Sequence, residues 1–155
     1  MTIRNFSNED MPYIQTIVDG LHPKWFDDGA VKNIPFDINF QKAYVADVDS
    51  KVVGFISIRS QDGKPYIGWL GVDIRSHRSG IGKALVAHVQ DLLVAAGANT
   101  LRVETVVEQD PPDGSYDLTV KFYKSCGFAI EHVEERKTAD GFKFSMGTMI
   151  KELGS

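Results

Sequence analysis

The amino-acid sequence predicts an α+β fold, with a mixed, mainly antiparallel sheet and helices on both faces. The chain has 155 residues, 43% hydrophobic and 25% charged, which suits a single domain, 1–155, with a sizeable core. Short apolar runs separated by tight turns fill the first half of the sheet and favour hairpins. From residue 66 the order becomes strand, helix, strand, helix, strand, which favours a mixed sheet with covered faces.

The N-terminal region is predicted to hold one strand and one helix before an irregular segment. A short strand is expected at 3–6, and a helix follows with Ser7 as its N-cap and Pro12 in its first turn. Residues 20–40 contain two prolines, two glycines and four aromatic residues. We expect an irregular segment there that forms a binding lip or a cover over the sheet.

The remaining elements alternate more regularly. Their apolar patterning predicts strands at 43–48, 52–59, 66–72, 99–107, 128–135 and 142–150. Helices are expected at 81–96 and 116–125, and Gly97 is a natural residue to follow the end of the first of them. A turn-rich loop is expected at 108–115.

One loop carries most of the functional information. The apolar strand 67–72 leads into a polar loop with two glycines one residue apart, Gly80 and Gly82, where a helix begins. A helix N-terminus offers unpaired N–H groups and partial positive charge, which suits a phosphate or pyrophosphate. On the spacing of the two glycines alone, the alternative is a tight turn that requires glycine for its backbone conformation. Cationic side chains crowd the same point: Arg75, His77, Arg78 and Lys83.

Two motifs together resemble a known family. Segment 77–82, His-Arg-Ser-Gly-Ile-Gly, resembles the Gln/Arg-x-x-Gly-x-Gly/Ala acetyl-CoA motif of the GNAT N-acetyltransferase superfamily, with His77 where the family usually has Arg or Gln. Segment 122–128, Phe-Tyr-Lys-Ser-Cys-Gly-Phe, resembles the family's Phe/Leu-Tyr-x-x-x-Gly-Phe signature. The resemblance covers roughly residues 43–150, and the first forty residues match only loosely.

The resemblance implies a GNAT-like sheet with a splayed central strand pair, 66–72 and 101–107. The gap would admit the pantetheine arm of acetyl-CoA, the co-substrate, along the main chain of the first strand. The implied cofactor-binding residues are Leu70, Val72, His77, Arg78, Ser79, Gly80, Ile81, Gly82, Lys83 and Lys124.

The resemblance also implies a catalytic acid at Tyr123, where many family members place a tyrosine that protonates the departing thiolate. A phenol with a pKa near 10 is mostly protonated at neutral pH and is able to donate. The alternative is a core tyrosine with a packing role.

Glu104 is the first candidate for the catalytic base. Strand alternation puts it on the same face as Arg102. A carboxylate there would take the proton of an ammonium acceptor directly or through water, and the alternative is an edge charge paired with Arg102. Glu108, Asp27 and Asp28 remain further candidates for the base.

Other reactive side chains are interpreted as packing residues. Cys126, the single cysteine, occupies a slot that is usually apolar in the family, so a small buried thiol is expected. The four histidines show no metal-ligand spacing, so no metal is expected. Trp69 is a candidate for lining the acceptor site.

Composition excludes several classes of function. The net charge of −4 disfavours nucleic-acid partners. No signal peptide and no apolar stretch long enough to cross a membrane is seen, and one cysteine fits a reducing compartment, so a cytoplasmic protein without a membrane partner is expected. A homodimer is left open.

The expected reaction moves the acetyl group of acetyl-CoA to a primary amine of a small molecule, peptide or protein, by direct attack in a ternary complex. The acceptor is expected between segment 20–40 and loop 108–115, both rich in acidic and aromatic residues. Two solvated loops are the alternative there. A non-catalytic acyl-CoA sensor on the same fold, and a nucleotide-phosphate-binding protein, are the competing functions.

Overall fold

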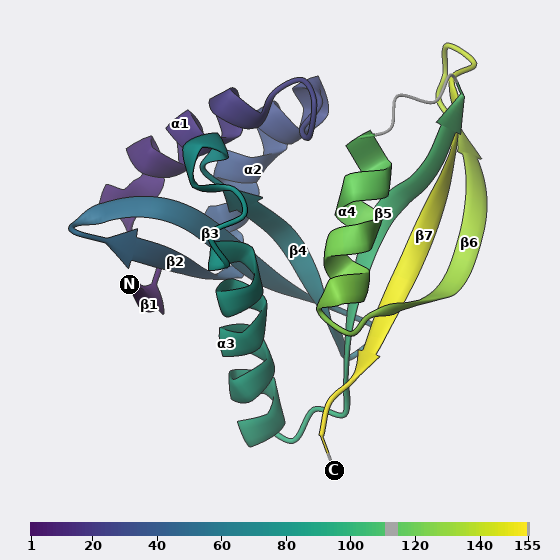
Figure 1. The fold of residues 1–155 in the computed structure, drawn as a ribbon. Helices are drawn as coiled ribbons and strands as arrows, with labels where there is room; N and C mark the ends of the chain where they lie inside the picture. Colours follow the sequence, from purple (N-terminus) through teal and green to yellow (C-terminus); the bar gives the residue numbers. More distant parts are fainter. Residues whose placement is uncertain (111–114, 155) are drawn as a thin grey trace.

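The computed structural model describes residues 1–110 and 115–154 (Figure 1). The elements are β1 (Thr2–Asn5), a 3-10 turn η1 (Asn8–Asp10), α1 (Met11–Leu21), α2 (Asp28–Phe40), β2 (Lys42–Val48), β3 (Lys51–Gln61), β4 (Lys64–Val72), a 3-10 turn η2 (Ile74–Ser76), α3 (Ile81–Ala95), β5 (Thr100–Asp110), α4 (Ser115–Ser125), β6 (Ala129–Lys137) and β7 (Lys143–Glu152). The predicted strands and three of the helices are confirmed, with ends that differ by a few residues.

The strands form one seven-stranded sheet in the order β1-β2-β3-β4-β5-β7-β6. Neighbours in β1–β4 and in β5-β7-β6 are antiparallel, and the pairing of β4 with β5 is parallel. A parallel pair needs a crossover connection, and α3 supplies it. The predicted α+β class with a mixed, mainly antiparallel sheet is therefore confirmed.

Two apolar clusters cover opposite faces of the sheet, as expected. One cluster packs α3 and α4 against the sheet and includes Leu85, Leu101, Met149 and Tyr123. The other packs α1 and α2 against β2, β3 and β4 only, through residues such as Ile14, Ile34 and Phe55. Figure 1 shows the same division, with α1 and α2 over the strands near the N-terminus.

The prediction of an irregular segment at 20–40 is wrong for its second half, which is α2. Asp27 caps this helix by accepting a hydrogen bond from the Ala30 N–H at 2.8 Å. The buried residues Ala30, Ile34 and Ile38 recur every fourth position, a helical signal that Gly29 and Pro35 obscured. Burial of this face against the sheet outweighs the hydrogen bond that Pro35 cannot make.

The chain start also differs from the prediction. Ser7 begins the short turn η1 rather than α1, and its N–H donates to the Asp10 carboxylate at 2.8 Å. Arg4 on β1 binds both oxygens of Asp10 at 2.9 Å, which lowers the pKa of that buried carboxyl. No helix among the described residues is long and apolar enough to cross a membrane.

Candidate active site

The sheet opens between β4 and β5. The two strands pair only at Tyr66 with Arg102 and at Ile67 with Val103, although β4 continues to Val72 and β5 to Asp110. Beyond the last pair they diverge, and Figure 1 shows them as the two arms of a V. The splayed central pair is thus present, and its opening lies at the C-terminal end of β4, where the glycine loop begins.

A β-bulge in β4 lies beside this opening. Ile58 pairs with Ile67 and Ile56 pairs with Leu70, so Gly68 and Trp69 together oppose the single residue Ser57. A bulge leaves one residue without a ladder partner and bends its strand. The Ser57 hydroxyl compensates, because it accepts the Trp69 N–H at 2.9 Å. Sequence reasoning missed this feature, although a lone glycine in an apolar strand is a known sign of a bulge.

The main chain of β4 beyond the bulge faces the opening at alternate residues. Asp73 donates its N–H to Val53 O of β3 at 2.8 Å. In an antiparallel pair, polar groups of successive residues point to opposite edges, so those of Val72 and Leu70 point away from β3. His77 confirms this direction, because its Nε2 lies 2.9 Å from Val72 O. Leu70 and Val72 therefore present the main-chain edge that sequence analysis assigned to pantetheine.

The glycine loop forms the start of helix α3 with a backbone geometry that suits an anion. Gly80 is the N-cap of α3 with φ +84°, and Arg78 also has a left-handed φ of +66°. The first α3 hydrogen bond runs from the Ala84 N–H to Gly80 O at 3.0 Å, so the N–H groups before Ala84 have no partner within the helix. Together with the helix dipole, these groups suit a pyrophosphate.

The cationic side chains of the loop divide into two kinds. Arg75 binds Asp73 at 3.0 Å, and that contact lowers the pKa of the Asp73 carboxyl. Arg78, Ser79 and Lys83 are exposed at the loop, and Lys124 is exposed on α4. Arg75, although itself exposed, is therefore engaged within the loop, whereas Arg78, Lys83 and Lys124 stay the candidates for contact with a ligand's phosphates.

Gly82 has a packing reason to be glycine as well as a binding one. A Cβ at this position would lie 3.0 Å from the Phe122 ring of α4, whereas one at Gly80 would meet nothing within 4 Å. Gly82 therefore lets α3 approach α4, and its partner Ile81 is buried in the same core. This packing role stands beside the role in phosphate approach that the sequence predicts.

Tyr123 lies on α4, within the core cluster that packs α3 and α4 against the sheet. Its side chain is 6% exposed and its ring packs edge-on against Phe122 and Phe128, at centroid distances of 5.2 and 5.5 Å. Burial raises the pKa of its hydroxyl well above the ordinary value. Tyr123 therefore packs in the core, and burial keeps its phenol protonated. Its role as a catalytic acid stays a prediction.

Glu104 lies one residue beyond the last β4–β5 pair, at the base of the V. Its two carboxylate oxygens lie 3.5 Å from Arg59 on β3 and 3.8 Å from Arg136 on β6. The expected pairing with Arg102 is wrong, since Arg102 binds Glu131 at 2.9 Å. Contacts of 3.5 Å and more are longer than hydrogen bonds, so lone pairs of Glu104 remain available to a ligand.

The segment before α2 lies over the end of β4. Phe26 packs edge-on against Trp69 at 5.9 Å, and Trp25 packs edge-on against His77 at 5.1 Å. Asp27 caps α2, and Asp28 is 97% exposed and binds His22 at 2.6 Å. Aromatic rings therefore form this wall, and neither aspartate is directed at the opening by these contacts.

The Trp69 side chain is held by helix α2. Its indole N–H donates to Asp37 of α2 at 2.8 Å, and its side chain packs with the α1–α2 core.

Among the other candidate bases, the side chain of Glu108 lies outside the described residues, as do those of Asp110 and Asp113 in the predicted loop 108–115.

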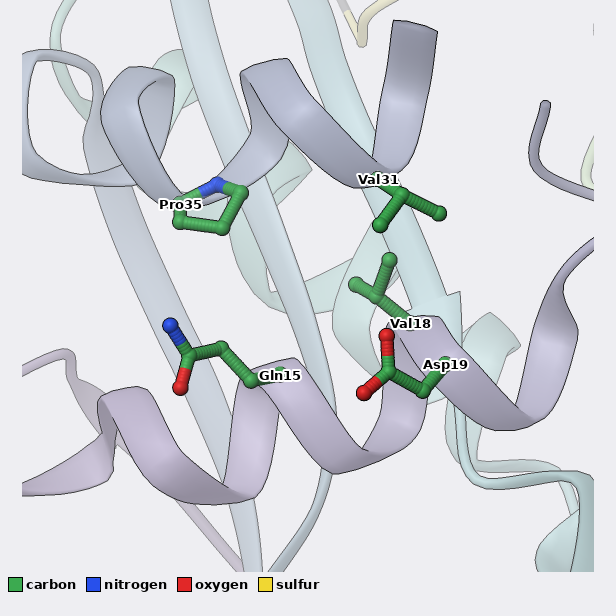
Figure 2. A pocket seen from close by; sticks show the side chains of 5 residues that line it. All are labelled: Gln15, Val18, Asp19, Val31 and Pro35. Carbon is green, nitrogen blue, oxygen red and sulfur yellow. The ribbon is translucent and has the colours of Figure 1, made fainter. Parts of the chain in front are cut away.

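Neither the single thiol nor a metal-binding cluster supplies a reactive group to this site among the described residues. Cys126 is partly buried, and burial raises the pKa of its thiol, which fits the predicted inert role. No group of three or more His, Cys, Asp or Glu side chains among the described residues could hold a metal. A shallow hollow lies elsewhere, between α1 and α2, lined by Gln15, Val18, Asp19, Val31 and Pro35 (Figure 2).

Comparisons with known proteins agree with this geometry. The model of the acetyltransferase (GNAT) domain matches residues 39–130, which is more than half of the chain. The fold is similar to that of an aminoglycoside 6′-N-acetyltransferase solved with coenzyme A (TM-score 0.79, 18% identity, 100% and 98% of the two chains covered). It is also similar to the ribosomal-protein-S18-alanine N-acetyltransferase of Escherichia coli (0.74, 21%, 99% and 94%).

A third similar structure is the aminoglycoside 6′-N-acetyltransferase of Enterococcus faecium (TM-score 0.72, 19% identity, 100% and 98% covered). No match was found among curated protein sequences. Identities at this level establish the fold, whereas the domain match, the splayed β4–β5 pair and the glycine loop at the start of α3 establish the family. The chain belongs to the GNAT family of acetyl-CoA-dependent N-acetyltransferases.

Proposed function

We propose that this protein transfers the acetyl group of acetyl-CoA to a primary amine of a small molecule, peptide or protein, by direct attack in a ternary complex. One observation carries the proposal. The main-chain edge at Leu70 and Val72 and the unpaired N–H groups at the start of α3 border the same opening. Acetyl transfer by direct attack depends mainly on holding two substrates together, and these two features would hold the two parts of the donor beside one opening.

The donor side would be held by the backbone. The N–H groups of Ile81, Gly82 and Lys83 suit the pyrophosphate, with Arg78, Ser79 and Lys83 side chains beside it and Lys124 across on α4. The main chain of Leu70 and Val72 would pair with the pantetheine arm, as a strand would. His77 now contacts Val72 O, so we expect its ring to give way there when the donor binds.

Two side chains would move protons. The Tyr123 hydroxyl remains protonated because burial raises its pKa, so it would donate to the departing thiolate. Glu104, at the base of the V, would accept the proton of the attacking amine directly or through a water. Arg59 and Arg136 would hold the Glu104 carboxylate in place during that step.

The acceptor would enter from the side of the sheet that Trp25 and Phe26 border. Aromatic faces hold ammonium groups by cation–π contact, and Lys24 already lies 4.5 Å from the Trp25 ring centroid. The similar structures named for aminoglycoside and ribosomal-protein alanine acetylation act on amines of very different size. We therefore propose an amine acceptor without narrowing its size.

Thiol release with a panel of amines tests the proposal. Thermal unfolding would first show stabilisation by acetyl-CoA and CoA, with less by ATP and NAD. Wild-type protein should then release CoA thiol when a suitable amine is added, and the product should carry one acetyl group by mass spectrometry. Stabilisation by acetyl-CoA without thiol release across the panel would instead favour the acyl-CoA sensor.

A further inference from the structure

A buried polar bridge links helix α2 to the bulge of β4. The Ser57 side chain is fully buried, accepts the Trp69 N–H at 2.9 Å and donates to the Gln41 side-chain oxygen at 2.6 Å. Gln41 is the C-cap residue of α2, so the bridge joins the helix to β3 and β4 through side chains. Buried hydroxyls are costly unless paired, and this one is paired twice.

Gly68 makes room for the bridge. A Cβ on Gly68 would lie 2.0 Å from the Gln41 side-chain oxygen and 2.8 Å from the Ser57 hydroxyl. The Gln41 amide therefore lies against the bare backbone of the bulge. Gln41, Ser57 and Gly68 therefore pack closely against one another. They do so just before the part of β4 whose main chain faces the opening.

A second contact from the same helix supports the bulge. Asp37, one turn before Gln41, accepts the Trp69 indole N–H at 2.8 Å. Trp69 is thus held at its backbone by Ser57 and at its side chain by Asp37. The next residue along the strand is Leu70, whose main chain faces the opening, so any movement of the bulge moves that edge.

We propose that Ser57 and Gln41 are positioning residues for acetyl transfer, which hold the Gly68–Trp69 bulge so that the Leu70 main chain is in register with the thioester. This inference rests on the proposed function of the same site. Ser57 and Gln41 do not touch the substrates, and they act through the backbone of β4. The pyrophosphate end, at the start of α3, does not depend on the bridge.

The test compares turnover with binding in matched variants. Ser57→Ala should lower kcat by about 10- to 100-fold, because misplacement by about 1 Å has an effect of that size. The Kd for CoA should change by less than about 3-fold, since the helix start keeps its N–H groups. Ser60→Ala, an exposed serine further along β3, is the control and should leave both constants unchanged.

Gln41 variants separate positioning from general loss of structure. Gln41→Ala should reproduce the loss of kcat, and Gln41→Glu, which keeps the acceptor oxygen, should restore most of it. The double variant Ser57→Ala/Gln41→Ala should be no slower than the slower single variant, because both remove one bridge. Hydrogen exchange at residues 67–72 should be faster in Ser57→Ala than in Ser60→Ala.

Two results separate failure of this inference from failure of the proposed function. A folded Ser57→Ala or Gln41→Ala protein with wild-type kcat, or with equal losses in kcat and CoA affinity, would overturn the positioning role alone. If Ser57→Ala does not fold, the Gln41 pair decides. Wild-type protein that binds acetyl-CoA and acetylates no amine would contradict the proposed function and the inference together.

Discussion

The two halves of the sheet on either side of the β4–β5 opening are built differently. Strands β2–β4 are covered on both faces, by α3 on one side and by α1 and α2 on the other. Among the described residues, β5 and β7 contribute to one core cluster only and β6 contributes to neither, and these strands carry ion pairs such as Arg102–Glu131 and Glu104–Arg136. The first half offers backbone groups to a ligand, and the second offers charged side chains.

In the proposed reaction, this difference would divide the work between the two halves. Main-chain groups would bind the donor, because its shape is fixed and backbone groups vary little with side-chain identity. Side chains at the base of the V would take the proton of the attacking amine, because proton transfer needs titratable groups. Variants on each side should therefore affect different kinetic constants, which makes the comparison testable.

The largest effect is expected at Tyr123, on α4. Tyr123→Phe should lower kcat by about 10- to 1,000-fold, the usual contribution of a general acid, and leave the Kd for CoA nearly unchanged. Because burial raises the pKa of the phenol, the acid stays protonated beyond its ordinary titration range. The kcat–pH profile of the wild type should show no loss from this group near pH 10.

A Tyr123→Phe protein with wild-type kcat would leave Tyr123 only its packing role against Phe122 and Phe128. Unfolding temperature is the control for this variant, because the ring that packs in the core is retained. A drop in activity matched by a large drop in unfolding temperature would contradict the acid role.

Glu104→Gln tests the charged half. The variant keeps the size of the side chain and removes its charge, so kcat should fall by about 10- to 100-fold while the KM for acetyl-CoA stays the same. Arg136→Gln, which removes one neighbour of the carboxylate, should have a smaller effect. Equal kcat values for Glu104→Gln and wild type at every pH would assign the proton to another group.

Gly82→Ala tests the backbone half. Its Cβ would press on the Phe122 ring at 3.0 Å, so the ring or the start of α3 has to give by a few tenths of an ångström. The Kd for CoA should rise by about 10-fold, as expected from loss of one or two charge-assisted hydrogen bonds. Gly80→Ala is the matched comparison, because it meets no atom and costs about 1 kcal/mol through its left-handed backbone.

If Gly80→Ala weakens CoA binding more than Gly82→Ala, backbone conformation matters more than the α3–α4 contact. Isothermal titration with CoA and thermal unfolding of both variants measure the two contributions separately.

The smallest effect is expected at Asp27. Asp27→Asn retains a side-chain oxygen that caps α2, so unfolding free energy should change by less than about 0.5 kcal/mol, whereas Asp27→Ala should lose about 1 kcal/mol. The KM for a cationic acceptor should be unchanged in Asp27→Asn. An increase of several-fold in that KM would restore this residue to the acceptor site.

Sequence was most informative where the site is made of backbone. The spacing of Gly80 and Gly82 after an apolar strand predicted a helix start that binds anions, and the structure has the corresponding cap and unpaired N–H groups. Local patterning encodes such geometry within a few residues. The same holds for the strands and for α3.

Sequence was less informative where the site depends on contacts between distant elements. Glu104 pairs with residues of β3 and β6 that no local sequence pattern connects. The Ser57–Gln41 bridge joins the strands to α2, a helix that was not predicted because Pro35 lies within it. The close approach of Gly82 to the Phe122 ring likewise depends on how α3 and α4 pack. Tertiary distances of this kind are not encoded by spacing along the chain.

The helix start of α3 has a consequence for how this protein tolerates change. Where a donor is bound by backbone N–H groups, those groups are present whatever the side chain is. Most single substitutions around such a site would therefore change the surrounding side chains and leave the N–H groups in place. His77 shows this freedom, since the family usually has Arg or Gln there and the amides remain available. If the acceptor binds beside Trp25 and Phe26 as proposed, substitutions there would change the acceptor that is preferred, while the same acetyl donor would continue to be used.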